Sequence, residues 1–311
     1  MRSMPDHQTF PIGVPGTPWG APEKAAWLAR QTRRRSYEAD VLAAIETLRS
    51  RHDVVQYGRL DCDRAVYPLM ALRSRGWRSE LPVALVTGGV HGYETSGVHG
   101  ALRFLAEHAA AYAERINLLV APCVSPWAYE TIQRWNMHAV DPNRSFFSDS
   151  AAQESAALMQ LIAPVRDRVR VHIDLHETTD SDESEFRPAL AARDGVEFVP
   201  GIIPDGFYLV DDTERPQADF QNAVIAAVAQ VTHIAPADPD GKIIGSPVVA
   251  PGVIQYPLKR LGLCAGMTDA VFRTTTEVYP DSPQANAEIC ILAQVTAVRA
   301  ALDHTLSAGA R

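Results

Sequence analysis

The chain has 311 residues, of which 46% are hydrophobic, and a formal net charge of −8. This length allows a large buried core in one domain. The acidic balance argues against a nucleic-acid partner, because such proteins normally carry a basic footprint. No apolar run approaches the ~20 residues of a membrane span, so we expect no membrane partner. The first eight residues lack the apolar stretch of a secretory signal, and the four cysteines are scattered; both features predict a cytoplasmic protein.

Apolar periodicity divides the chain into an irregular lead-in, residues 1–20, and a single domain over residues 21–311. Spacing typical of amphipathic helices predicts helices over residues 21–52, 95–115, 154–162, 217–231 and 282–306. Runs rich in β-branched residues predict strands over residues 54–60, 65–72, 83–86, 116–121, 169–176 and 270–279. This alternation indicates an α/β fold with a mixed, largely parallel central sheet and helices on both faces.

Charged runs are expected at the surface. Arg33-Arg-Arg35 reads as the solvated face of the first helix. The stretch over residues 178–262 shows little regular pattern. Its acidic runs, 180–185 and 211–214, could favour basic substrates by electrostatic steering, but we read them as solvated loops. Long irregular segments in a compact domain are usually functional.

The most informative motif is His91-Gly-Tyr-Glu94, which follows the apolar run Val83 to Val86 and two glycines. An imidazole and a carboxylate three positions apart, just past a strand, can converge on one cation. These are ligand types that zinc accepts in catalytic sites. By itself this spacing also fits a loop histidine beside a glutamate that favours a helix start through the helix dipole.

A second β-rich run, Val169 to Asp180, supplies another histidine. Asp174 and His176 are two positions apart and therefore share a face of the strand. His176 stands where the apolar run stops, which is where open α/β sheets place functional side chains. His172 lies about 13 Å further back and reads as a core histidine. Two histidines and one carboxylate would leave a fourth position open, which is the catalytic pattern for zinc.

Between these motifs lies a long segment with Arg134-Trp-Asn136 and Asp141-Pro-Asn-Arg144. The order His-x-x-Glu, Arg-x-Asn, Asp-x-Asn-Arg, Asp-Leu-His and a late strand with a glutamate resembles the zinc carboxypeptidases of the M14 (funnelin) type. The resemblance runs from about Tyr57 to near the end of the chain. Deacylases of the aspartoacylase and succinylglutamate desuccinylase kind share the zinc site and the Asp-x-Asn-Arg motif.

The resemblance implies that one zinc ion per chain is bound by His91, Glu94 and His176. It also implies that Asp141 holds a ligand imidazole in its tautomer. Arg134 would polarise the scissile carbonyl.

On the substrate side, the resemblance implies that Asn143 and Arg144 grip the terminal carboxylate, a task suited to a bidentate guanidinium. Glu277, near the end of the last predicted strand, would be the general base. Tyr256 would be the mobile tyrosine that closes over the substrate. By position, residues 178–262 would form the rim of the active-site funnel.

We therefore expect a zinc metallocarboxypeptidase that hydrolyses a C-terminal amide bond by Glu277-assisted attack of a metal-bound water. Its partner would be a peptide or N-acyl amino acid with a free carboxylate. The first alternative is an N-acyl amino acid deacylase, whose Asp-Leu-His-Glu-Thr-Thr run the chain also matches. The helix and two strands ahead of His91, and the single helix after Glu277, favour the peptidase. The second alternative, a non-catalytic binding protein on the same fold, would require a missing ligand or base, and none is missing.

Overall fold

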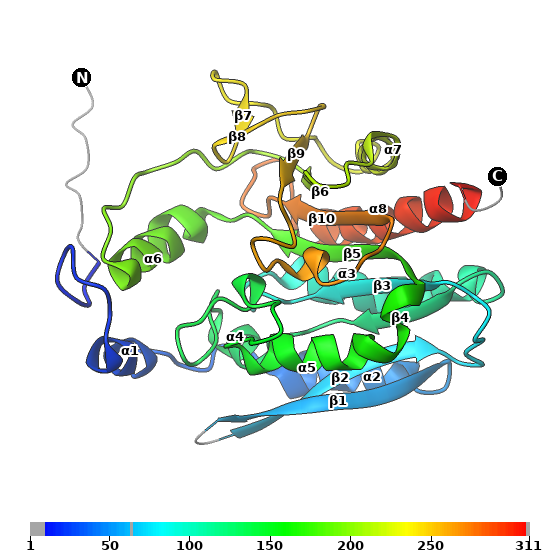
Figure 1. Ribbon diagram of the computed structural model, residues 1–311, viewed down its shortest axis with the longest axis horizontal. Helices are drawn as coiled ribbons and strands as arrows, with labels where there is room; N and C mark the ends of the chain where they lie inside the picture. The colour runs from blue at the N-terminus through cyan, green and yellow to red at the C-terminus, as the bar shows by residue number, and fades with distance from the viewer. Residues whose placement is uncertain (1–9, 63–64, 309–311) are drawn as a thin grey trace.

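The computed structural model describes residues 10–62 and 65–308, and an eight-stranded sheet runs through its centre (Figure 1). The strands, in the order in which they lie side by side, are β1 (His52–Cys62), β2 (Ala65–Ser74), β4 (Asn117–Ala121), β3 (Val83–Gly88), β5 (Val169–Glu177), β10 (Phe272–Val278), β6 (Tyr208–Asp212) and β9 (Val253–Tyr256). A separate small ribbon pairs β7 (Lys242–Ile243) with β8 (Ser246–Pro247).

The centre of the sheet, β4-β3-β5-β10, is entirely parallel. Antiparallel pairs attach β1 and β2 on one side and β6 on the other, and β9 then runs parallel to β6. The predicted mixed, largely parallel sheet is therefore confirmed. Because β3, β5 and β10 are parallel, their carboxyl ends meet at one edge, and in Figure 1 the ends of β5 and β10 point toward α6.

Helices cover both faces of the sheet. They are α1 (Ala21–Leu28), α2 (Ala43–Leu48), α3 (Thr95–Glu107), α4 (Pro126–Thr131), α5 (Gln153–Ile162), α6 (Arg187–Asp194), α7 (Ala218–Val228) and α8 (Ala287–Ala308). One hydrophobic core joins α2, α3, α7 and α8 to the sheet, and a second joins α5 to the opposite face (Figure 1). β3 is buried along its whole length and β5 along nearly all of it, which explains their continuous apolar sequence.

The predicted helix over residues 21–52 is wrong, because it is interrupted between Leu28 and Glu38. In the gap, the backbone amides of Arg34 and Arg35 donate to the carbonyl of Glu130 at 2.7 and 3.2 Å. Tertiary hydrogen bonds to α4 thus replace helical ones. The Arg33–Arg35 run is also not simply a solvated face, since it is held against α4.

The acidic runs are not solvated loops throughout. Residues 182–186 form a short helical turn that leads into α6, and Asp182 within it is buried. Asp211 and Asp212 end the buried strand β6, and Asp212 pairs with Arg273 at 2.5 Å. A carboxylate with a guanidinium or amide partner inside the fold is indistinguishable in sequence from a surface one.

Other boundaries shift by a few residues. The helix expected over residues 95–115 ends at Glu107 and is followed by a 3₁₀ turn, and the last helix begins at Ala287 rather than near residue 282. Residues 10–20 are irregular, as predicted for the lead-in. Residues 1–9 of that lead-in, and Asp63 and Arg64 of the predicted turn between the first two strands, lie outside the described residues.

One described helix, α8, is long and apolar enough to cross a membrane by length and composition alone, with a mean hydropathy of 1.2. The expectation that no run approaches this length therefore does not hold for it. Half of its apolar window is buried inside the protein. Cys290, Val298 and Leu302 are fully buried in the core that it shares with α3 and α7, as expected of a core helix.

We predict that Arg273→Met lowers the free energy of unfolding by about 3–5 kcal/mol, because it strands the buried carboxylate of Asp212. The double variant Arg273→Met with Asp212→Asn buries no charge and should be clearly more stable than the single variant. Urea unfolding followed by circular dichroism measures both. Equal midpoints for the single and double variants would contradict the prediction.

Candidate metal centre and pocket

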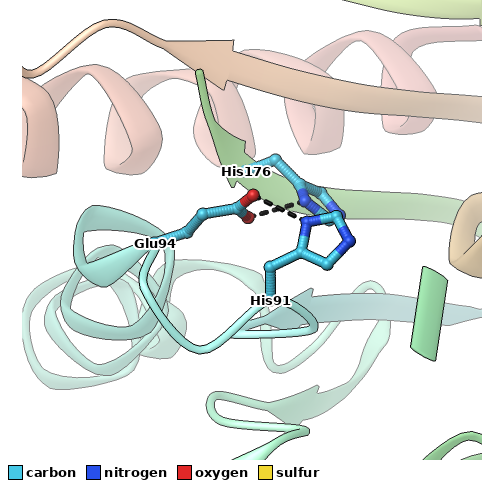
Figure 2. Close-up of side chains that lie close together, drawn as sticks. All are labelled: His91, Glu94 and His176. Carbon is cyan, nitrogen blue, oxygen red and sulfur yellow. Dashed lines mark hydrogen bonds and ion pairs between the residues drawn. The ribbon is translucent and has the colours of Figure 1, made fainter. Parts of the chain in front are cut away.

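The three predicted metal ligands come together at the carboxyl ends of the central strands. His91 lies in the turn after β3, Glu94 immediately precedes α3, and His176 is near the end of β5. Figure 2 shows the carboxylate of Glu94 facing both imidazole rings, with a dashed line to each. All three side chains are almost fully buried, and their potential ligand atoms lie within 4.8 Å of one another.

The orientation of the rings fits a metal site. The Nδ1 atoms of His91 and His176 lie 2.7 and 2.6 Å from the two oxygens of Glu94. Oε2 of Glu94 nevertheless has no well-formed hydrogen bond, although it is buried. Buried polar atoms without partners are rare and need an explanation. Two nitrogens and a carboxylate oxygen that converge in this way fit a zinc ion, whose catalytic sites use three such protein ligands.

Each ligand imidazole is held from behind by a carboxylate. Nε2 of His91 lies 3.1 Å from Oδ1 of Asp141, and Nε2 of His176 lies 2.7 Å from Oδ2 of Asp174. The second contact was not predicted, although the Asp-x-His spacing on one strand was its signal. Such carboxylates fix the tautomer and raise the basicity of a ligand histidine, which leaves both Nδ1 atoms facing the metal position.

The local charges favour ionised carboxylates. Burial would raise the pKa of Glu94, but His176 and His91 lower it to about 2. Burial would likewise raise the pKa of Asp141, but Arg134 and His91 hold it well below its usual range. Both groups are therefore anionic at neutral pH, as metal ligation and imidazole orientation require.

Arg134 lies beside the centre and lines the same pocket. Its guanidinium donates to Oδ2 of Asp141 at 3.2 Å and to Oδ1 of Asp182 at 3.3 Å. It also donates to the hydroxyl of Tyr93, which in turn donates to Asp182 at 2.8 Å. Tyr93 and Asp182 were not predicted as site residues, and no sequence spacing links them to Arg134.

Asn143 and Arg144, the predicted carboxylate grip, lie in different environments. Oδ1 of buried Asn143 accepts from the amide of Cys264 at 2.7 Å, and its Nδ2 lies 3.4 Å from Nε2 of His176. Arg144 donates to the carbonyl of Asn143 at 2.8 Å. Among the described residues it has no carboxylate within 4 Å. Its guanidinium is thus available to an anion in the pocket.

The candidate base Glu277 sits directly beside His176 in the register of the parallel strands β10 and β5. Its Oε2 accepts from the hydroxyl of Thr178 at 2.9 Å. Burial raises the pKa of Glu277 to about 8. Tyr256, at the end of β9, lines the pocket together with Glu277. Its predicted closing movement stays a prediction.

One pocket of about 1050 Å³ is lined by His91, Glu94, Arg134, Asp141, Asn143, Arg144, Tyr256 and Glu277, whereas His176 and Asp174 lie behind its wall. Residues 178–262 supply much of the rest of its wall, so this stretch surrounds the site as predicted. The lead-in contributes Trp19, and α1 contributes Lys24. Further lining residues are Thr178, Phe186, Arg187, Leu190, Arg193, Ile202, Tyr208, Val210, Ile244 and Leu263.

Residues 80–193 match the family model of the succinylglutamate desuccinylase/aspartoacylase catalytic domain. No curated protein matches the sequence of the chain. The match supports the predicted relation of this part of the chain to the desuccinylase/aspartoacylase branch.

Solved structures resemble the fold. A presumed metallopeptidase from Shewanella amazonensis SB2B has a TM-score of 0.62 at 22% identity, over 89% of this chain and 99% of that one. A metallo-carboxypeptidase from Burkholderia cenocepacia has a TM-score of 0.60 at 14% identity, over 88% and 70%. One from Pseudomonas aeruginosa, solved with (2-guanidinoethylmercapto)succinic acid, has a TM-score of 0.57 at 15% identity, over 85% and 68%.

We predict that Asp174→Asn weakens zinc binding about 10–100-fold, the usual effect of losing a carboxylate behind a ligand histidine. The amide keeps the size of the side chain but no longer attracts the Nε2 proton of His176 as a charge. Titration of the metal-free protein against a chromogenic chelator measures the affinity. An affinity equal to that of the unmodified protein would contradict a role for Asp174.

Proposed function

We propose that this chain is a zinc-dependent carboxypeptidase of the M14-like type. Its residues 80–193 match the model of the succinylglutamate desuccinylase/aspartoacylase catalytic domain, and its fold resembles that of a metallo-carboxypeptidase. The observation that carries the proposal is that two residues of the metal centre, His91 and Glu94, line the same pocket as the Arg144 guanidinium. A guanidinium without a carboxylate partner suits a substrate with a free terminal carboxylate. A cleft of about 1050 Å³ also leaves room for residues on both sides of the scissile bond.

His91, Glu94 and His176 would hold the zinc ion. Once bound there, zinc would act as a Lewis acid that polarises the scissile carbonyl and lowers the pKa of water. Glu277 faces the same space, so it takes the proton of the attacking water and passes it to the leaving amine. Arg134 stabilises the negative charge that grows on the carbonyl oxygen. The buried aspartates on either side of it hold its guanidinium in place.

Arg144 orients the substrate by its carboxylate. Burial lowers the pKa of the Arg144 guanidinium, because desolvation disfavours its charge. A bound carboxylate would supply the missing counter-charge. Asn143 positions this arginine, since its carbonyl accepts from the guanidinium and its side chain is tied to Cys264. Tyr256 would close over the bound substrate.

A second candidate is an N-acyl amino acid deacylase. It is favoured by the match of residues 80–193 to the desuccinylase/aspartoacylase domain. Its substrate would use the same centre and the same Arg144, but it would fill only part of the cleft. A panel of C-terminally varied peptides beside N-acyl amino acids separates the two functions, because the preferred substrate has the higher kcat/KM.

We predict that kcat/KM rises with pH as Glu277 loses its proton. A carboxyl whose pKa is raised by burial acts as a base only above that pKa. The rise of kcat/KM with pH should therefore be centred above pH 4.5, the ordinary pKa of a glutamate, and extend toward the pKa of about 8 that burial gives Glu277. A bound cation stabilises the carboxylate form of Glu277, and this shifts the rise of kcat/KM to lower pH. Glu277→Gln should reduce kcat by about 10²–10⁴-fold while zinc stays bound. A pH series for the unmodified enzyme and metal analysis of the variant check both parts. Retained activity in the variant would rule out Glu277 as the base.

We predict that Arg144→Ala raises KM mainly for substrates with a free carboxylate, because this contact is present in the ground and transition states alike. The unmodified enzyme should cleave a peptide acid far better than its C-terminal amide, and the variant should lose that preference. Arg73→Ala, which removes an exposed guanidinium on β2, is the matched control. Equal cleavage of acid and amide by the unmodified enzyme would replace the carboxypeptidase proposal with a general amidase.

A further inference from the structure

The irregular segment between α1 and the helical turn at Glu38 lies against α4, outside residues 80–193. Glu130 of α4 anchors it. The carbonyl of Glu130 accepts from the amides of Arg34 and Arg35, and its carboxylate accepts from the amide of Tyr37 at 2.9 Å. The hydroxyl of Tyr67 donates to the second carboxylate oxygen at 2.9 Å. The buried Glu130 therefore fixes the path of this segment.

From this path the side chain of Arg35 reaches the loop that carries two metal ligands. Its Nη1 donates to the carbonyl oxygens of Gly92 and Tyr93, at 3.3 and 3.4 Å. These two residues separate His91 from Glu94. The guanidinium carbon lies 5.3 Å from the ring centre of Tyr129 on α4, a cation–π distance. Within the described residues, no carboxylate lies within 4 Å of the Arg35 guanidinium.

The backbone of the loop also packs closely against α4. The amide of Gly92 donates to the carbonyl of Gln133 at 3.0 Å. A Cβ atom at Gly92 would lie 1.9 Å from the carbonyl carbon of Ala128, so only glycine fits. The ligand loop is thus held between α4 and the Arg35 guanidinium. Loss of Arg35 would free the two carbonyls to rotate and change the separation of His91 and Glu94.

We propose that Arg35 is a positioning residue for the metal centre, which sets the geometry of His91 and Glu94 through the carbonyls of Gly92 and Tyr93. The inference rests on the proposed zinc site and extends it to a segment that the desuccinylase/aspartoacylase match does not include. Arg35 is not among the residues that line the pocket. Its effect is to keep two ligands at the spacing that one ion requires.

The test compares full-length Arg35→Met with the unmodified protein and with Arg33→Met. Arg33 lies on the same segment and pairs with Glu130 at 2.9 Å, but it makes no hydrogen bond to residues 91–94. Both variants remove one guanidinium, so they match in charge. Zinc affinity is measured by competition with a chelator. The visible spectrum of the cobalt-loaded protein reports ligand geometry, and the melting temperature of the metal-free protein reports folding.

Arg35→Met should bind zinc at least tenfold more weakly and alter the cobalt spectrum, the usual size of effect for groups behind metal ligands. Arg33→Met should leave both unchanged. Arg35→Lys, which keeps a cationic donor, should recover part of the affinity. The inference is overturned, while the zinc site stands, if Arg35→Met and Arg35→Lys both bind zinc as tightly as the unmodified protein. It is also overturned if Arg33→Met loses as much zinc affinity as Arg35→Met. If the unmodified protein binds no zinc, both are overturned.

Discussion

The candidate metal centre depends on one interaction, in which the Nδ1 atoms of two imidazoles converge on the carboxylate of Glu94. Burial of a carboxylate costs several kcal/mol unless positive charge or hydrogen bonds compensate it. Here His91 and His176 lower its pKa to about 2, yet one of its oxygens makes no well-formed hydrogen bond. A divalent cation at this point would satisfy all three groups at once. The surrounding structure holds the three side chains in place for that role.

The parallel sheet makes the convergence possible. His176 near the end of β5 and the turn after β3 meet because the two strands run in the same direction with aligned ends. β10 adds Glu277 at the level of His176. Buried supports then extend outward from the centre. Asp174 lies behind His176, and Thr87 on β3 donates to Asp174 at 2.6 Å. Arg134 holds Asp141 behind His91 in the same way.

The protein is acidic overall, yet its pocket contains cationic side chains that have no carboxylate partner in the described part of the chain. Asp182, Asp211 and Asp212 belong to the acidic runs, but they are turned inward and engaged with Tyr93, Gln221 and Arg273. They are therefore not arranged to attract basic substrates. Among the described lining residues, Arg144 and the exposed Lys24 are cations with no carboxylate within 4 Å. The net charge of −8 is a sum over the whole chain, whereas recognition depends on which groups remain uncompensated inside the cleft.

The sequence by itself determined the parts that depend on short-range order. Apolar runs and their lengths define the central strands, and polar residues at the strand ends mark His91, Glu94 and His176, because the carboxyl ends of parallel strands share an edge. Tertiary structure decided the rest. Asp182 reaches Arg134 across 48 positions, and Arg35 reaches Gly92 across 57. No local periodicity encodes such contacts. Hydrogen bonds from the amides of Arg34 and Arg35 to the carbonyl of Glu130, which is far away in the sequence, likewise interrupt the helix that local spacing predicts over residues 21–52.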